Sequence, residues 1–132
     1  EAYCGGRAIT ERATELLGPG PGDGWTVGAV VAAANGTGSI ATAAAALLAE
    51  AAEAACTLVE NACTLLNPSA VVLGGGVLSG WPELARRIEA HVQRSTSTPI
   101  HAQLQWAPTL GGSDAILWGA AAATGALWAK PR

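Results

Sequence analysis

The hydrophobic positions at the start of the chain follow a helical period. From Ala8 to Leu17, apolar residues recur three and four positions apart, which gathers them on one face of a helix and leaves charged residues on the other. The glycine–proline run at residues 18–24 ends this helix and forms a loop. Residues 25–36 then predict a shorter helix, closed by Asn35-Gly36, a pair that favours the left-handed conformation of a helix end.

A long helix is predicted in the middle of the chain. Every residue from Ile40 to Leu66 is compatible with a helix, and Thr37 or Ser39 can cap its start. The helix would therefore span about residues 39–66 and extend for about 40 Å. Asn67-Pro68 ends it, because the residue before a proline is disfavoured in the α region.

Extended segments are predicted only after this long helix. The apolar run at 70–73 is short and bounded by turn residues, which is typical of a strand buried on both faces of a parallel sheet. Three consecutive glycines, residues 74–76, follow it directly. A helix beginning near Trp81-Pro82 leads to residues 100–106, where apolar and polar residues alternate as in a half-buried strand. A last helix is predicted from about 113 to 128.

This order of elements predicts an α/β fold with an incomplete sheet. Two parallel strands joined through a helix form a right-handed β-α-β unit, but a fully apolar strand needs neighbours on both of its edges. We therefore expect further strands upstream of Glu1. In that case the chain is a fragment of a larger protein, and its alanine-rich helices form a layer over the sheet.

Composition narrows the class of protein further. The 132 residues, half of them apolar, suffice for one domain with a core, although alanine dominates and Phe and Met are absent. A net charge of −3 with scattered basic residues gives no footprint for nucleic acid. The chain shows neither a signal peptide pattern nor an uncharged apolar stretch of membrane-spanning length, and its three cysteines suit a reducing compartment. We expect a soluble, cytoplasmic protein.

The glycines at 74–76 have two interpretations. They would allow a tight turn from strand to helix, or they would let a ligand lie directly against backbone amides at the carboxyl edge of the sheet, where α/β proteins bind their ligands. The stretch is not a P-loop, because no Lys-Ser/Thr pair follows, and it lacks the GxGxxG spacing of a dinucleotide-binding turn. The pattern alone leaves both interpretations open.

Three motifs, in order along the chain, resemble one protein family. EAYCGGRAI at residues 1–9, LLNPSAVVLGGGVL at 65–78 and TLGGSDAILWGAAAA at 109–123 are similar to the C-terminal part of sugar kinases of the ROK family, the group that contains bacterial glucokinases, other hexose and N-acetylhexosamine kinases and sugar-responsive repressors. The resemblance covers essentially the whole chain, and its middle motif is the most specific. It implies an actin-like, ribonuclease H-like ATPase fold of two lobes, with residues 1–132 forming the C-terminal lobe.

The resemblance also implies roles for individual residues. Gly74, Gly75 and Gly76 correspond to the turn that contacts the adenosine of ATP. Glu1 corresponds to a glutamate that accepts hydrogen bonds from sugar hydroxyls, a role suited to a carboxylate, although an exposed chain end is the alternative interpretation of this residue. The segment 110–122 corresponds to the helix that links the two lobes, where small residues permit close packing.

Other parts of the family's active site are not expected in this chain. The family's catalytic aspartate, phosphate loop, Glu-x-Gly-His motif and cysteine-rich zinc motif all precede the position of Glu1, so no residue is assigned here as a catalytic base or a metal ligand. A structural zinc would belong to the intact protein. Cys4 follows the zinc motif and is interpreted as a substitute for a small residue in a helix. Asp114 suits a helix N-terminus better than a catalytic role, and neither His91 nor His101 lies near a partner that would complete a metal site.

These observations favour the C-terminal, nucleotide-binding part of an ATP-dependent hexose kinase, which transfers the γ-phosphoryl group of Mg-ATP to a sugar hydroxyl. The fragment alone, without the lobe that carries the base, is expected to be inactive. Two alternatives stay open: a sugar-sensing repressor of the same family, and a non-catalytic interaction module built on the long alanine-rich helix. A homodimer or higher homo-oligomer is expected, and this segment is not expected to bind nucleic acid or a membrane.

Overall fold

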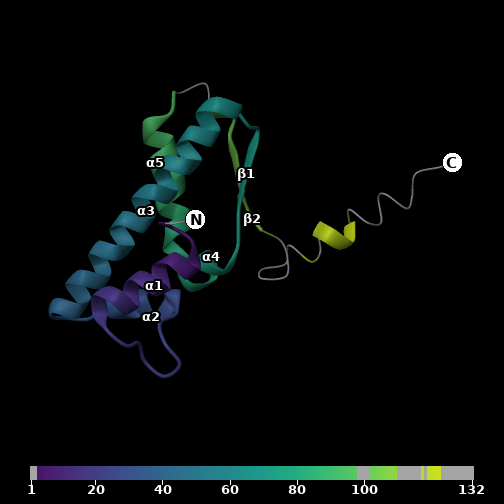
Figure 1. Cartoon of the computed structure of the whole chain (residues 1–132). Helices are drawn as coiled ribbons and strands as arrows, with labels where there is room; N and C mark the ends of the chain where they lie inside the picture. The colour runs from purple at the N-terminus through teal and green to yellow at the C-terminus, as the bar shows by residue number, and fades with distance from the viewer. Residues whose placement is uncertain (1–2, 98–101, 110–116, 118, 123–132) are drawn as a thin grey trace.

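The computed structural model describes residues 3–97, 102–109, 117 and 119–122. In Figure 1, the long helix α3 runs along the length of the molecule, α1 and α2 lie against its first half, and α5 and the two strands lie beside its second half. The elements follow in the order α1 (Gly6–Leu17), α2 (Val27–Ala34), α3 (Ser39–Leu66), β1 (Ala70–Leu73), α4 (Gly76–Gly80), α5 (Glu83–Ser95) and β2 (Gln105–Pro108).

Helix α3 forms the centre of the core. It spans Ser39–Leu66, as the sequence predicts, and it ends at Asn67, whose left-handed φ of 43° avoids the α conformation that Pro68 disfavours. The predicted side-chain cap is wrong, because Gly38 occupies the N-cap position and no side chain bonds to the first turn. Small side chains dominate the buried face, which lets α1, α2 and α5 pack closely against it. The buried residues of α3 are Ala41, Ala44, Leu47, Leu48, Ala51, Ala52, Ala55, Cys56 and Cys63.

The two helices before α3 differ from the prediction at their ends. α1 begins at Gly6, slightly earlier than predicted. α2 begins after Thr26, whose hydroxyl accepts a hydrogen bond from a backbone amide of the first turn at 3.1 Å. The predicted left-handed end of α2 is wrong: Asn35 has right-handed α geometry, and the Gly36 amide donates to a carbonyl three residues back at 3.0 Å, which satisfies the helix end through a tighter final turn.

The sheet of the described residues has two parallel strands, in a register that pairs Ala70 with Gln105. Strand β1 has the bounds predicted from the sequence. The strand predicted at 100–106 is placed too early, because residues 102 and 103 form a helical turn and β2 begins only at Gln105. The alternation of buried and exposed residues holds from Leu104 onward. The period-two pattern therefore indicated a strand in this segment, but it did not show at which residue the strand begins.

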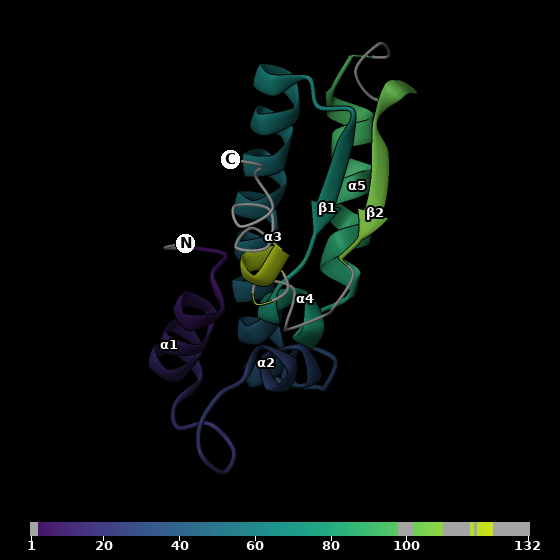
Figure 2. The ribbon, with the colours of Figure 1, turned by 90° about the vertical axis from the view of Figure 1, so that its right-hand side faces the viewer.

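Only one face of this sheet is covered by described residues. Val71 and Leu73 pack against the helical core, whereas Val72 on the opposite face is 60% exposed. Figure 2 shows α3 and α5 behind the same face of the two strands. The prediction that β1 is buried on both faces is therefore wrong for the described structure, and the expectation of further strands stays a prediction.

Two helices, α4 and α5, lie between the strands in the chain, and a further helical segment follows β2. The sequence did not predict α4, a helix of five residues that begins at the last of the three glycines. The helix predicted near Trp81-Pro82 begins at Glu83. Of the helix predicted from about 113 to 128, residues 117 and 119–122 are helical, and the rest of that prediction lies outside the described residues.

Helix α3 is long and apolar enough, by length and composition, to cross a membrane, and it is the one such helix in the described part of the chain. It is also the helix against which α1, α2 and α5 pack. Burial by three other helices is the arrangement expected of a core helix.

Candidate functional site

The turn between β1 and α4 brings three exposed glycines to the carboxyl end of the sheet. Gly74 lies against the segment that follows β2: a Cβ built on it would stand 2.7 Å from Cγ2 of Thr109 and 2.8 Å from Cβ of the same residue. Carbon atoms in van der Waals contact are about 3.5–4.0 Å apart. Position 74 therefore has no room for a side chain.

The other two glycines have different surroundings. Gly75 has φ of 110° and ψ of 173°, a region that is essentially open only to glycine. Its carbonyl accepts hydrogen bonds from the amide and the hydroxyl of Ser79, at 3.2 and 3.3 Å. Gly76 begins α4 without a left-handed φ, and a Cβ there would meet no atom within 4 Å. The tight turn thus accounts for glycine at 74 and 75 but not at 76.

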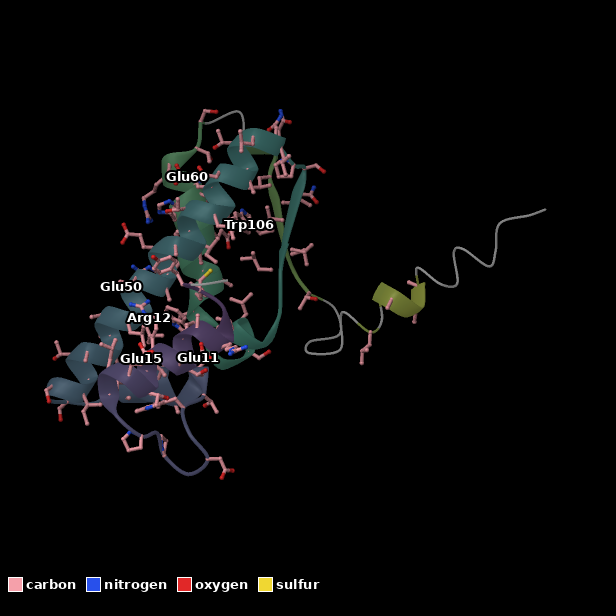
Figure 3. The ribbon with its side chains drawn as sticks, viewed as in Figure 1. Glu11, Arg12, Glu15, Glu50, Glu60 and Trp106 are labelled. Carbon is pink, nitrogen blue, oxygen red and sulfur yellow. The ribbon has the colours of Figure 1, made fainter. Side chains whose placement is uncertain are left out.

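A groove of about 330 Å³ lies beside this turn. Leu73, which directly precedes the glycines, and Leu78 of α4 both line the groove, whereas none of the three glycines does. Its apolar lining comes from both strands and both helices α4 and α5: Leu73, Leu78, Pro82, Ala85, Trp106 and Ala107. Figure 3 shows Trp106 on the side of the sheet that faces the helices.

Two charged residues of α5, Arg86 and Glu89, complete the lining of the groove. The Arg86 side chain is 77% exposed and lies 3.3 Å from the carboxylate of Glu83. Glu89 is half-buried and accepts a hydrogen bond from Gln93 at 3.4 Å. Both charged side chains reach solvent, and the other residues that line the groove are apolar.

The other residues singled out in the sequence lie elsewhere. Glu1, which the resemblance assigns to the sugar, is outside the described residues, as are Asp114 and His101. Cys56 and Cys63 are free and buried, as predicted, and burial raises the pKa of both thiols above that of an exposed cysteine.

No metal centre is formed by the described residues, in which no group of three or more His, Cys, Asp or Glu side chains comes close enough to hold an ion. Cys4, interpreted from the sequence as part of a helix, lies in the turn before α1 and is partly buried against the core. That helix assignment is therefore wrong, because α1 begins only at Gly6.

Two contacts between helices were missed by the sequence reasoning. Nε2 of His91 in α5 lies 2.7 Å from Oε2 of Glu60 in α3, and each side chain is about one-third exposed. Arg12 in α1 contacts the carboxylate of Glu50 in α3 through Nη2 (Figure 3), while its buried Nη1 has no hydrogen-bond partner in the described structure. The partners are 31 and 38 residues apart in sequence, so only the crossing of the helices brings them together. Both contacts tie a neighbouring helix to α3.

Comparison with known proteins gives one match. The family model described as "ROK family" matches residues 1–126, a range that includes both strands, the glycine turn and the groove. No curated protein and no solved structure matches the chain. Because the family model spans nearly the entire chain, this protein belongs to the ROK family.

Proposed function

We propose that this chain supplies the nucleotide-contacting part of an ATP-dependent hexose kinase. The ROK family includes sugar kinases and repressors. The observation that supports a nucleotide at the turn is Gly76, an exposed glycine in the first turn of a helix where neither packing nor backbone geometry requires a missing side chain. Glycine in a helix is about 1 kcal/mol less favourable than alanine, and a ligand lying against the backbone would be a reason to retain it.

The chemistry of the turn suits a nucleotide. Amide groups in the first turn of a helix have no intrahelical acceptor, bare backbone lets a ribose approach closely, and the carboxyl ends of parallel strands are the usual ligand edge of an α/β protein. Phosphoryl transfer depends chiefly on positioning and on neutralising charge. In this proposal the chain positions ATP, and Mg²⁺ carried with ATP supplies the charge neutralisation. We assign no catalytic base and no Mg²⁺ ligand to the described residues.

The proposal extends to the sugar, the fold and the assembly of the protein. Glu1 would accept hydrogen bonds from the hexose hydroxyls, and the actin-like fold implied by the family would add further strands to the sheet of β1 and β2. We also propose a cytoplasmic homo-oligomer. The apolar side chains that α1, α2 and α5 leave uncovered on the second half of α3 would contribute to its interface: Leu58, Leu65 and Leu66, which are 63%, 82% and 75% exposed.

Calorimetric titration with Mg-ATP tests the proposed nucleotide site. We expect the chain to bind Mg-ATP and Gly76→Ala to weaken that binding about tenfold, or about 1.4 kcal/mol, because the new methyl group would meet the ligand and no protein atom. Gly119→Ala is the matched control, since Gly119 is another helical glycine with open space around it, and it should bind like the unchanged chain. Failure of the unchanged chain to bind Mg-ATP, or equal binding by Gly76→Ala, contradicts the proposal.

A coupled assay of ATP consumption with a panel of hexoses separates binding from turnover. We expect no hexose-dependent turnover by this chain alone, and such turnover would show that the base is present after all. In the full-length gene product, hexose-dependent ATP consumption supports the kinase. Sugar-dependent release of DNA without ATP consumption would instead support a repressor.

A further inference from the structure

The short helix after the glycine turn, α4, packs very closely on α2 at its last residue, Gly80. A Cβ built on Gly80 would stand 3.0 Å from the amide nitrogen of Gly28 and 3.2 Å from Cβ of Val27. The second distance is shorter than the carbon–carbon contact of about 3.5–4.0 Å. Gly80 does not have a left-handed φ, so the closeness of α2, and not the backbone geometry, excludes a side chain there. Figure 2 shows α4 beside α2.

Of these two helices, α2 is the more firmly held. Val27 and Val30 of α2 are buried in the core, and α2 packs along α3, whereas α4 has no buried residue. A helix that is part of a closely packed core yields little to an added methyl group. A side chain at position 80 would therefore displace α4 by a few tenths of an ångström and leave α2 in place.

A displacement of α4 would reach the glycine turn directly. Gly76 is the first residue of α4. The amide and the hydroxyl of Ser79, which directly precedes Gly80, donate hydrogen bonds to the Gly75 carbonyl at 3.2 and 3.3 Å. These bonds join the last turn of α4 to the residue before its start, so the turn moves together with the helix.

This inference rests on the proposed function, in which a nucleotide lies against the backbone of the glycine turn. We propose that Gly80 is a positioning residue for that site. Its missing side chain lets α4 pack directly on α2, and this contact sets where the backbone of the turn meets the nucleotide. Gly80 acts only through α4 and does not touch the ligand. Groups that bind a ligand have to be held within about 0.5 Å of their productive positions, so a smaller displacement weakens binding without abolishing it.

Calorimetric titration of three alanine variants with Mg-ATP tests this role. Gly80→Ala should weaken binding about threefold, because the expected displacement is within the tolerated range. Gly28→Ala is the matched control on the other side of the same contact, since a Cβ there would have its nearest atom at 3.7 Å, and it should bind like the unchanged chain. Gly20→Ala is the control for lost stability. Its Cβ would stand 2.4 Å from the amide nitrogen of Trp25, in the loop between α1 and α2, so it should lower the free energy of unfolding and leave the ATP affinity unchanged.

The amide resonance of Gly75 in two-dimensional NMR spectra gives a readout that needs no ligand. It should shift in Gly80→Ala and stay in place in Gly28→Ala and Gly20→Ala. If circular dichroism shows that Gly80→Ala does not fold, Ser79→Ala takes its place in the titration. Ser79 is exposed, and loss of its hydroxyl, which bonds to the Gly75 carbonyl, should weaken ATP binding about twofold.

The outcomes separate this role from the proposed function. The positioning role is overturned, and the proposed function stands, if the unchanged chain binds Mg-ATP and a folded Gly80→Ala binds it equally well, or if Ser79→Ala does so in its place. An unmoved Gly75 resonance in Gly80→Ala, or equal weakening of ATP binding by Gly20→Ala, overturns the role as well. If the unchanged chain does not bind Mg-ATP, the proposed function fails and the role of Gly80 fails with it.

Discussion

The three glycines after β1 should respond differently to replacement by alanine, and the geometry of the turn gives the size of each effect. At Gly74 the added methyl group would lie 2.7 Å from Cγ2 of Thr109. Restoring normal contact requires a movement of about 1 Å, and overpacking of this kind costs about 1–3 kcal/mol of unfolding free energy. Thr109→Gly removes both of the closest clashing atoms, so the double variant should recover most of the stability that Gly74→Ala loses.

The other two positions lack this steric clash. Gly75→Ala has room, but its φ of 110° strains any residue with a side chain by about 1–3 kcal/mol. Alanine also restricts the unfolded chain, and this effect raises the free energy of unfolding by about 0.4–1 kcal/mol. We therefore expect a net loss of about 1–2 kcal/mol in the free energy of unfolding. Thr109→Gly should not restore this loss. Gly76→Ala meets neither obstacle and should leave the stability unchanged or raise it by up to about 1 kcal/mol.

Urea denaturation followed by far-ultraviolet circular dichroism measures these differences. With a slope of about 1–3 kcal/mol per molar urea, each lost kcal/mol lowers the midpoint by about 0.3–1 M. The turn geometry is refuted if Gly76→Ala is as destabilising as Gly75→Ala. It is equally refuted if Thr109→Gly leaves the loss in Gly74→Ala unchanged.

Two further predictions concern the contacts and thiols of α3. A double-mutant cycle with His91→Gln and Glu60→Gln should give a coupling free energy of about 0.2–1 kcal/mol, which is the range for partly exposed pairs. A coupling free energy of zero would mean that this contact does not stabilise the packing of α5 on α3. Because burial raises the pKa of the Cys56 and Cys63 thiols, little reactive thiolate forms at about pH 8. Iodoacetamide labelling mapped by mass spectrometry should modify the partly exposed Cys4 first and the two buried thiols only on unfolding, so rapid labelling of Cys63 in the native chain would contradict its burial.

The elements that the sequence predicted well are those with strong local signals at both ends. Helix α3 lies between a glycine and Asn67-Pro68, and β1 lies between that proline turn and the glycines. Backbone restrictions of proline and glycine act within one or two residues, so no tertiary information is needed to read them. Where the signal was weaker, the prediction failed: α4 was missed, and β2 began later than its alternating pattern suggested.

The candidate site was predictable only in part. The motif resemblance pointed to Gly74, Gly75 and Gly76, but it could not separate their roles. The clash with Thr109, the φ of Gly75 and the open space at Gly76 follow from where the chain after β2 passes the turn. The groove beside the turn was not predicted, because its walls come from two strands and two helices that are distant in sequence.

The sequence by itself determined the helical and extended segments with strong boundaries, the buried character of the α3 cysteines and membership of the family, because periodicity, chain stiffness and motifs are local properties of the chain. Only the tertiary structure decided which face of the sheet is covered, that His91 meets Glu60, and that Trp106 lines a groove beside the glycine turn. These features depend on how helices cross and strands pair over long separations. The same local pattern of apolar and polar residues is compatible with several different arrangements of helices and strands, so the pattern alone does not select one of them.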